Sequence, residues 1–218
     1  MHQLPLPTVL HEDNHTIVVY KPSGIPLQPD QTHDLSLYDI VKNYLKHTYQ
    51  KQGDAFVGIV QRLDRPVSGV VLFAKTSKGA SRLCEQIRLR HISKQYQAIV
   101  LGHPSPPSAT LHHTLLSTDS HTKVAAQGKP ASLHYTTMAT NQTQSLLHIE
   151  LHTGRKHQIR CQLAAIGHPI VGDLRYGAPQ PCADRSIALC AWQLMFTHPT
   201  TKQPINVTLP PELQLHLP

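Results

Sequence analysis

The chain has 218 residues and carries 20 Lys and Arg against 13 Asp and Glu, which gives a formal net charge of +7. No stretch reaches the roughly 20 continuous apolar residues of a membrane helix, and the N-terminus lacks the basic start and apolar core of a signal peptide. These properties disfavour a membrane or secreted protein. They favour a cytoplasmic protein that binds a polyanion, with nucleic acid as the first candidate.

The first elements expected along the chain are a strand and a helix. Residues 16–20 form an apolar β-type run that ends in the turn sequence KPSG. A helix follows, with Asp34 or Ser36 available as its N-cap. Its apolar positions recur at helical spacing, at Leu37, Ile40, Val41, Tyr44 and Leu45.

Residues 57–76 hold the first candidate site. Two apolar runs, 57–60 and 70–74, predict two short buried strands joined by a turn, and the turn contains Arg62, Asp64 and Arg65. A carboxylate at the mouth of a strand pair is costly unless cations or hydrogen-bond donors accompany it, so this group is a candidate catalytic site. A solvated polar turn is the alternative that this segment alone leaves open.

A second helix is expected from Ser77, as its cap, to about Arg90. Its inward face would hold Leu83, Cys84 and Ile87, and its outward face is basic. The segment 94–102 alternates as a strand. The four cysteines have no CxxC spacing, and we expect reduced thiols in or near the core at Cys84, Cys161, Cys182 and Cys190.

Beyond residue 102 the sequence predicts mainly strands. The proline-rich segment 103–108 is a domain linker or, more simply, a connection within one domain. Strands are expected at 110–116, 122–126, 131–139 and 145–152, and a helix from about Lys156 to Ile166 that ends at Gly167. This irregular mixture predicts an α+β fold with a mixed, largely antiparallel sheet and flanking helices, in a single domain over 1–218.

Arg160 lies near the edge of the buried face of that last helix. An arginine beside an apolar wall needs an anion, and Asp64 is the best candidate partner. A plain ion pair that fastens helix to sheet is the alternative. The histidines are scattered, with only His112 and His113 adjacent and no third ligand evident, so no metal site is expected.

Several ordered segments resemble the RluA-like pseudouridine synthases. QRLDRPVSGVVLFAKT at 61–76 resembles that family's HRLDxxTSGxxxxAKT segment, and LHTGRKHQIRCQLAAIGHPIVGDLRYG at 151–177 is similar to its GRxHQIRxxLxxxGHPIxGDxxYG segment. Further similarity lies at the start, 9–30, in KQYQAIVLG at 94–102, in GKPA at 128–131 and in the closing strands at 189–203. The matches cover nearly the whole chain.

This resemblance implies a pseudouridine synthase-like catalytic fold and isomerisation of uridine to pseudouridine in ribosomal or transfer RNA, with no metal or organic cofactor. By position it implies Asp64 as the catalytic carboxylate, Arg160 as its ion-pair partner and Tyr96 against the target base. It also implies that Arg62 helps to extract the nucleotide from its stack. We expect RNA contacts from Arg62, Arg65, Lys75, Arg88, Arg90, Arg155 and His157.

The chemistry of the reaction fits these residue types. Breaking the C1′–N1 bond and rejoining through C5 requires a group that attacks or stabilises the sugar or the base, and an ionised Asp can do either. Removing uracil from its stack costs a few kcal/mol, which an aromatic platform and a planar guanidinium can partly repay. Without the motif, Tyr96 would be interpreted as an ordinary core residue.

The sequence departs from the family pattern at Gln61, Val67 and Lys156, none of which is assigned to chemistry. We expect a monomer without the S4-type RNA-binding domain of many relatives and without a protein partner. Two other functions remain possible. One is an RNA-binding protein that has lost turnover, and the other is a hydrolase that uses Asp64 with His157 as its base.

Overall fold

The computed structural model describes residues 4–119 and 121–217. The chain divides into two compact units, and each is built from two stretches of sequence. The first unit comprises Met1–Ile92 and Gln193–Leu209, and the second comprises Ser93–Trp192 and Pro210–Pro218. The expectation of a single catalytic domain over 1–218 stays a prediction.

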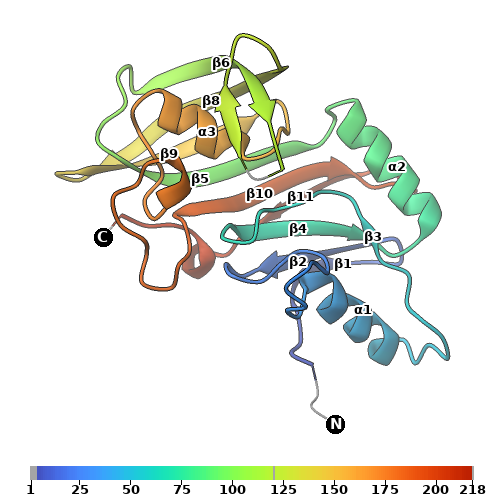
Figure 1. The fold of residues 1–218 in the computed structure, drawn as a ribbon. Helices are drawn as coiled ribbons and strands as arrows, with labels where there is room; N and C mark the ends of the chain where they lie inside the picture. The colour runs from blue at the N-terminus through green and yellow to red at the C-terminus, as the bar shows by residue number, and fades with distance from the viewer. Residues whose placement is uncertain (1–3, 120, 218) are drawn as a thin grey trace. The chain divides into compact units, whose positions relative to one another are not determined.

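The first unit carries a small antiparallel sheet with two helices (Figure 1). Its elements are β1 (Thr8–Glu12), β2 (Thr16–Lys21), α1 (Leu37–Thr48), β3 (Gly58–Ile59), β4 (Ser68–Ala74), α2 (Ser77–Arg88) and β11 (Pro204–Thr208). β2 pairs with both β1 and β4, and β3 pairs with β4. β10 (Leu189–Thr197) begins in the second unit and ends in the first, where it pairs with β11.

The apolar runs form the predicted strands because their side chains are buried on both faces. Every residue of β4 after Ser68 is buried, and β2 is buried except at Tyr20. The strand predicted at 57–60 is only two residues long, and β1 was not predicted. α1 begins with a capping box in which Ser36 and Asp39 exchange hydrogen bonds, which confirms Ser36 as the N-cap.

α2 differs from its prediction in three details. Thr76, rather than Ser77, is the N-cap, and its side chain accepts a hydrogen bond from the Gly79 backbone. The helix ends at Arg88, two residues before the predicted end. Cys84 is exposed, so its assignment to the inward face is wrong. It follows the fully buried Leu83 by one position, which is about 100° around the helix.

The second unit carries five strands that pair antiparallel, the first residues of β10 and one helix (Figure 1). Its elements are β5 (Ser93–Leu101), β6 (Ser108–Ser117), β7 (Thr122–Val124), β8 (Lys129–Thr140), β9 (Gln144–Leu151), α3 (Gln158–Ala165) and the 3₁₀ turns η1 (Leu174–Tyr176) and η2 (Pro211–Leu213). The strand order is β5-β9-β8-β6-β7, and each of these neighbouring pairs is antiparallel. The proline-rich segment 103–108 connects β5 to β6 within this unit.

α3 is shorter and more deeply buried than predicted. His157 stands before it with a left-handed backbone, φ 51°, so the helix begins at Gln158 and not at Lys156. The first six helical residues, 158–163, are all buried. Cys161 packs with Leu115, Ala131 and Tyr176 in a local apolar cluster. A helix buried on most of its circumference explains why its pattern was only weakly amphipathic.

Candidate active site

Asp64 lies half-buried in the turn between β3 and β4. Lys21 stabilises that turn by a hydrogen bond to the Arg65 carbonyl. The side chain of Lys21 is fully buried, and its ammonium donates to the carbonyls of Pro22, Ile25 and Arg65, each at 3.0 Å. Burial lowers the pKa of Lys21 to about 8, and the negative charge of Asp64 acts against that change. This role of Lys21 was not predicted, because in the sequence it is an ordinary turn residue at the start of KPSG.

The two arginines that flank Asp64 differ in their surroundings. Arg65 donates from Nε to the Gly24 carbonyl at 2.8 Å and from Nη1 to Thr32 Oγ1 at 3.1 Å, and it forms an ion pair with Asp34. Arg62 is exposed, and no residue within 4–119 or 121–217 accepts a hydrogen bond from its guanidinium. Arg65 is thus tied into a loop, whereas Arg62 projects into solvent.

Gln61 stands where relatives commonly have His, and it makes a local structural contact. Its side-chain amide donates to the carbonyl of Val70 in β4 at 3.2 Å. Gln61 therefore ties this turn to β4.

Lys75, expected to contact RNA, is held inside the first unit. Its ammonium lies 2.6 Å from Glu12 Oε1 and 2.9 Å from the Tyr49 hydroxyl, and it stands 4.3 Å above the Tyr49 ring centre. Burial lowers the pKa of Lys75, but the hydrogen bonds to these two side chains outweigh burial, so the pKa of Lys75 is raised. This geometry favours a structural role, and an RNA contact stays a prediction.

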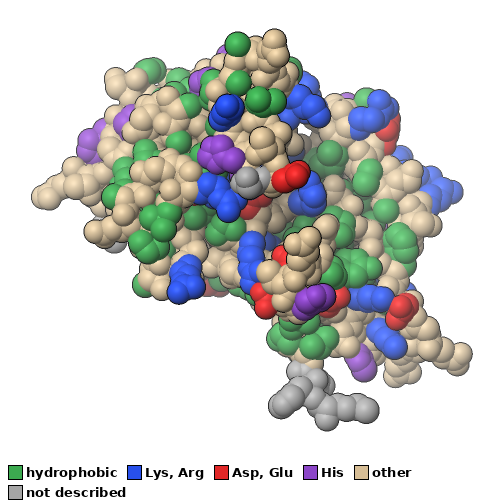
Figure 2. Space-filling view, in the orientation of Figure 1, with side chains coloured by type: hydrophobic (Ala, Val, Ile, Leu, Met, Phe, Trp, Pro, Cys, Tyr) green, Lys and Arg blue, Asp and Glu red, His purple; other side chains and the backbone are tan. Residues whose placement is uncertain are grey.

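The basic residues at the end of α2 are exposed. Arg88 forms an ion pair with Glu85 one turn earlier, and Arg90 follows the helix with a left-handed backbone. The space-filling view shows basic side chains over α2 with an acidic one beside them (Figure 2). Part of the positive charge on this helix is therefore compensated locally.

Arg160 has a buried carboxylate partner within the second unit. Its Nε donates to Asp173 Oδ2 at 2.6 Å and its Nη2 to Oδ1 at 2.8 Å, and the guanidinium carbon lies 5.0 Å from the centre of the Tyr176 ring. The Tyr176 hydroxyl accepts from the Thr122 backbone at 3.1 Å and lies 2.9 Å from His157 Nδ1. The HQIR and GDLRYG segments thus meet in one buried cluster.

Asp173 was not predicted as a site residue, although it lies in the quoted GDLRYG segment; the structure shows that it is only 1% exposed. Asp64, the partner expected for Arg160, belongs to the first unit, and the pairing of these two residues stays a prediction. Since Asp173 engages Nε and Nη2, it fixes the plane of the guanidinium whatever else the group contacts.

Tyr96 and Arg155 also lie in the second unit. Tyr96 is 7% exposed and stands in β5 opposite Ile149 of β9. Arg155 donates from Nε to the carbonyl of Pro130 at 3.1 Å, in the loop before α3. His157 ends this loop, with its ring against Tyr176.

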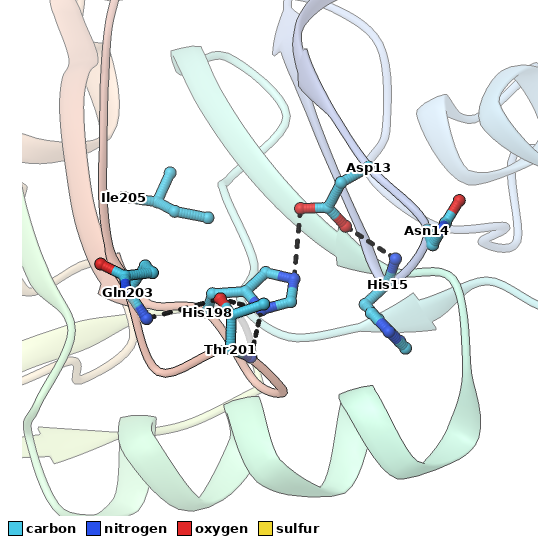
Figure 3. Close-up of a pocket in the computed structure, with 7 residues that line it drawn as sticks. All are labelled: Asp13, Asn14, His15, His198, Thr201, Gln203 and Ile205. Carbon is cyan, nitrogen blue, oxygen red and sulfur yellow. Dashed lines mark hydrogen bonds and ion pairs between the residues drawn. The ribbon is translucent and has the colours of Figure 1, made fainter.

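A hollow of about 350 Å³ lies in the first unit beside the β1–β2 turn (Figure 3). In it His198 Nε2 lies 3.3 Å from Asp13 Oδ2, and its Nδ1 accepts from the Thr201 backbone at 2.8 Å. Burial raises the pKa of Asp13, but backbone hydrogen bonds from His15 and Thr16 outweigh it and hold that pKa well below its ordinary value. Both ring nitrogens of His198 are engaged, so these groups fasten two turns together. The lining residues are Asp13, Asn14, His15, His198, Thr201, Gln203 and Ile205.

Within the described residues, no group of three or more His, Cys, Asp or Glu side chains is arranged to hold a metal ion. The helices described there are also too short or too polar to cross a membrane.

Comparison with solved structures supports the fold. The human RNA Pseudouridylate Synthase Domain Containing 4 superposes with a TM-score of 0.77 at 22% identity, over 94% of this chain and 90% of the other. Domain Containing 1 gives 0.75 at 23% identity, over 94% and 83%. These likenesses confirm the predicted α+β class.

Sequence comparison identifies the family. The sequence model of the RNA pseudouridylate synthase family matches residues 15–165. A ribosomal large subunit pseudouridine synthase D of Nitrosomonas europaea is 34% identical over 89% of this chain, and the chain spans 59% of that protein. An uncharacterised RNA pseudouridine synthase of Bacillus subtilis is 33% identical over 93% of this chain and 68% of its own length. The chain therefore belongs to the RNA pseudouridylate synthase family.

Proposed function

We propose that the protein isomerises uridine to pseudouridine in structured RNA, either ribosomal or transfer RNA, with large-subunit ribosomal RNA as the first candidate. The observation that carries this proposal is the family match over residues 15–165, which spans Asp64, Tyr96 and Arg160. The names of the large-subunit relatives favour ribosomal RNA.

In the proposed mechanism, Asp64 supplies the carboxylate that attacks or stabilises the sugar or base while the C1′–N1 bond breaks. Arg160 keeps that carboxylate ionised and oriented, with its own plane fixed by Asp173. Tyr96 offers its ring to the extracted uracil. The exposed guanidinium of Arg62 takes part in unstacking the nucleotide, a role that suits a side chain with no partner in the described chain.

The hydrolase alternative receives little support from the surroundings of His157. Its Nδ1 shares a hydrogen bond with the Tyr176 hydroxyl, and the ring stands edge-on to the Tyr176 ring. A general base needs a nitrogen that can reach water at the reacting atom. The arrangement of His157 instead favours support of the cluster around Arg160.

The test uses the purified protein with unmodified transcripts of large-subunit ribosomal RNA and of transfer RNAs. Pseudouridine is mapped by carbodiimide modification and primer extension, and the same mapping is made on RNA from cells with and without the gene. We expect modification at one or a few defined uridines, without a change in RNA mass. Release of free uracil would instead establish hydrolysis, and no modification of any transcript would overturn the proposal.

A further inference from the structure

Lys94 at the start of β5 is a half-buried cation that has no counter-charge in the described chain. Among the described residues, none accepts a hydrogen bond from its ammonium or forms an ion pair with it. Burial lowers the pKa of Lys94, and burial is the only cause acting on it. Partial removal of a charge from water is unfavourable when no partner offsets it, so an anionic ligand would stabilise this group.

The contrast with Lys21 makes the point specific. Lys21 is fully buried, and its three protons go to three carbonyl oxygens at 3.0 Å. Lys94 is half-buried, and its ammonium keeps access to solvent instead of meeting a carbonyl of the described chain. Its protons are therefore available to a ligand, whereas those of Lys21 are not.

The loop between β9 and α3 is fixed close to the Lys94 ammonium. A Cβ added at Gly154 would lie 3.2 Å from Lys94 Nζ, so the absence of a side chain there leaves room for the charge. Gln158, which is 3% exposed, holds this loop: its Oε1 accepts from Thr153 Oγ1 at 2.7 Å and from the Arg155 backbone at 3.0 Å. The space around Lys94 is therefore defined by an ordered backbone.

Lys94 shares a strand face with Tyr96. Alternate residues of a strand point to the same face, and two positions span about 7 Å. Glu150, the nearest carboxylate on the neighbouring strand, pairs with Gln95 and so points to the opposite face. The carboxylate of this neighbouring strand therefore does not compensate the charge of Lys94, and the site favours an anion from outside the chain.

We propose that Lys94 binds a backbone phosphate of the RNA next to the nucleotide whose base lies against Tyr96. This inference rests on the proposed function, because it takes RNA as the substrate. An ammonium on a flexible stem is a suitable point charge for phosphate, and its lack of a protein partner leaves its protons available. Lys94 is then a positioning residue, since it holds the strand and does not touch the reacting atoms.

The test combines a change in the RNA with a change at Lys94 and measures the RNA affinity of each combination. The RNA is a synthetic hairpin that contains the uridine identified by the mapping experiment. Around that uridine, each phosphate in turn is replaced by a neutral 2′-O-methyl methylphosphonate linkage, and the matched 2′-O-methyl phosphate serves as reference. With the unmutated protein, one replacement should weaken binding by about tenfold, the loss expected for one charge-assisted hydrogen bond. With Lys94→Gln, that same replacement should cause no further loss.

Three variants complete the design. In Lys94→Arg, the neutral linkage should still cause most of the affinity loss seen with the unmutated protein. In Lys129→Gln, which changes an exposed lysine, that loss should be the same as with the unmutated protein. Lys94→Met should keep or raise the melting temperature, because it removes a half-buried charge that has no partner in the described chain. A lower melting temperature with unchanged RNA affinity would assign Lys94 a structural role and overturn the proposal.

The outcomes separate this proposal from the function on which it rests. If the unmutated protein forms pseudouridine in the hairpin but Lys94→Gln loses affinity equally for every linkage tested, the function stands and the phosphate assignment is overturned. If no pseudouridine forms in any RNA, the proposed function itself fails.

Discussion

Arg160 and Asp173 form a two-point ion pair that is almost completely buried, with 2.6 Å from Nε to Oδ2 and 2.8 Å from Nη2 to Oδ1. Asp173→Ala should lower the free energy of unfolding by about 3–5 kcal/mol, because it leaves the guanidinium without its carboxylate. Arg160→Ala should cost a similar amount and also lower activity. Urea unfolding measures the first effect and pseudouridine formation the second.

The double variant Arg160→Met with Asp173→Leu is the matched control. It removes both charges, so it should be more stable than either Arg160→Ala or Asp173→Ala. If its loss of stability equalled the sum of the losses in the single variants Arg160→Met and Asp173→Leu, the pair would not be coupled and the interpretation would be wrong.

Asp64→Asn should abolish isomerisation while leaving RNA affinity and the melting temperature nearly unchanged, since it keeps the shape and removes the charge. The measurement is single-turnover pseudouridine formation at saturating protein. Residual turnover within tenfold of the parent corresponds to a barrier change of only about 1.4 kcal/mol and would contradict a catalytic role.

Lys21 should give the stability of the protein a dependence on pH above neutrality. Between pH 8 and 10.5 the folded protein binds fewer protons at this group than the unfolded chain, so its contribution to the free energy of unfolding rises with pH. Below pH 8 both states are protonated and the burial cost is present in full. The change across the window is about 3 kcal/mol.

Urea unfolding of the parent and of Lys21→Met at pH 7, 8.5 and 10 isolates this contribution. The stability of the parent relative to the variant should increase over the series. Lys46→Met, at an exposed position, controls for the loss of one lysine. A difference between parent and Lys21→Met that stays constant with pH would contradict the assignment.

The end of α2 should contribute to the salt dependence of RNA binding. Each phosphate contact to a single strand adds about −0.7 to the slope of log K against log salt. Reversing the charges of Arg88 and Arg90 to Glu should reduce the magnitude of that slope by about one to two units, without changing the order of preference among RNA sequences. Filter binding over a salt series measures the slope.

The control for α2 reverses Lys46 and Lys51, two exposed residues at the end of α1, and so changes the net charge by the same amount. Equal slopes in the two double variants would mean that only net charge matters, and an unchanged slope would place the RNA over another face.

The parts of the fold that the sequence predicted well are those with a strong local pattern. α1 combined a helical apolar stripe with a capping box, and β2 and β4 were continuous apolar runs. β1, with its mixed polar composition, gave no such pattern. α3 was placed correctly but predicted too long, because the left-handed backbone of His157 depends on the tertiary contact with Tyr176 and not on residue type.

The candidate site was predictable only where a motif marked it. Asp173 and Lys21 both lie inside quoted segments, but nothing in a single sequence distinguishes a buried ion-pair partner or a buried ammonium from an ordinary turn residue. Their burial comes from strands and loops distant in sequence, such as the Arg65 carbonyl that meets Lys21. Nothing in the sequence shows that the ammonium of Lys94 lacks a partner in the described chain, since that property depends on contacts that the fold does not provide.

β10 begins in the second unit and ends in the first, and each unit includes residues that follow position 192. The Gln86 side chain in the first unit donates to the Thr197 carbonyl, and Gln97 in the second unit accepts from the backbone of Leu215. During synthesis, therefore, neither unit can complete its contacts until residues 193–217 have left the ribosome. Most strands of both units have been synthesised by then. Nascent chains would expose unpaired strand edges in both units at once, and a protease that removed this segment would open both together.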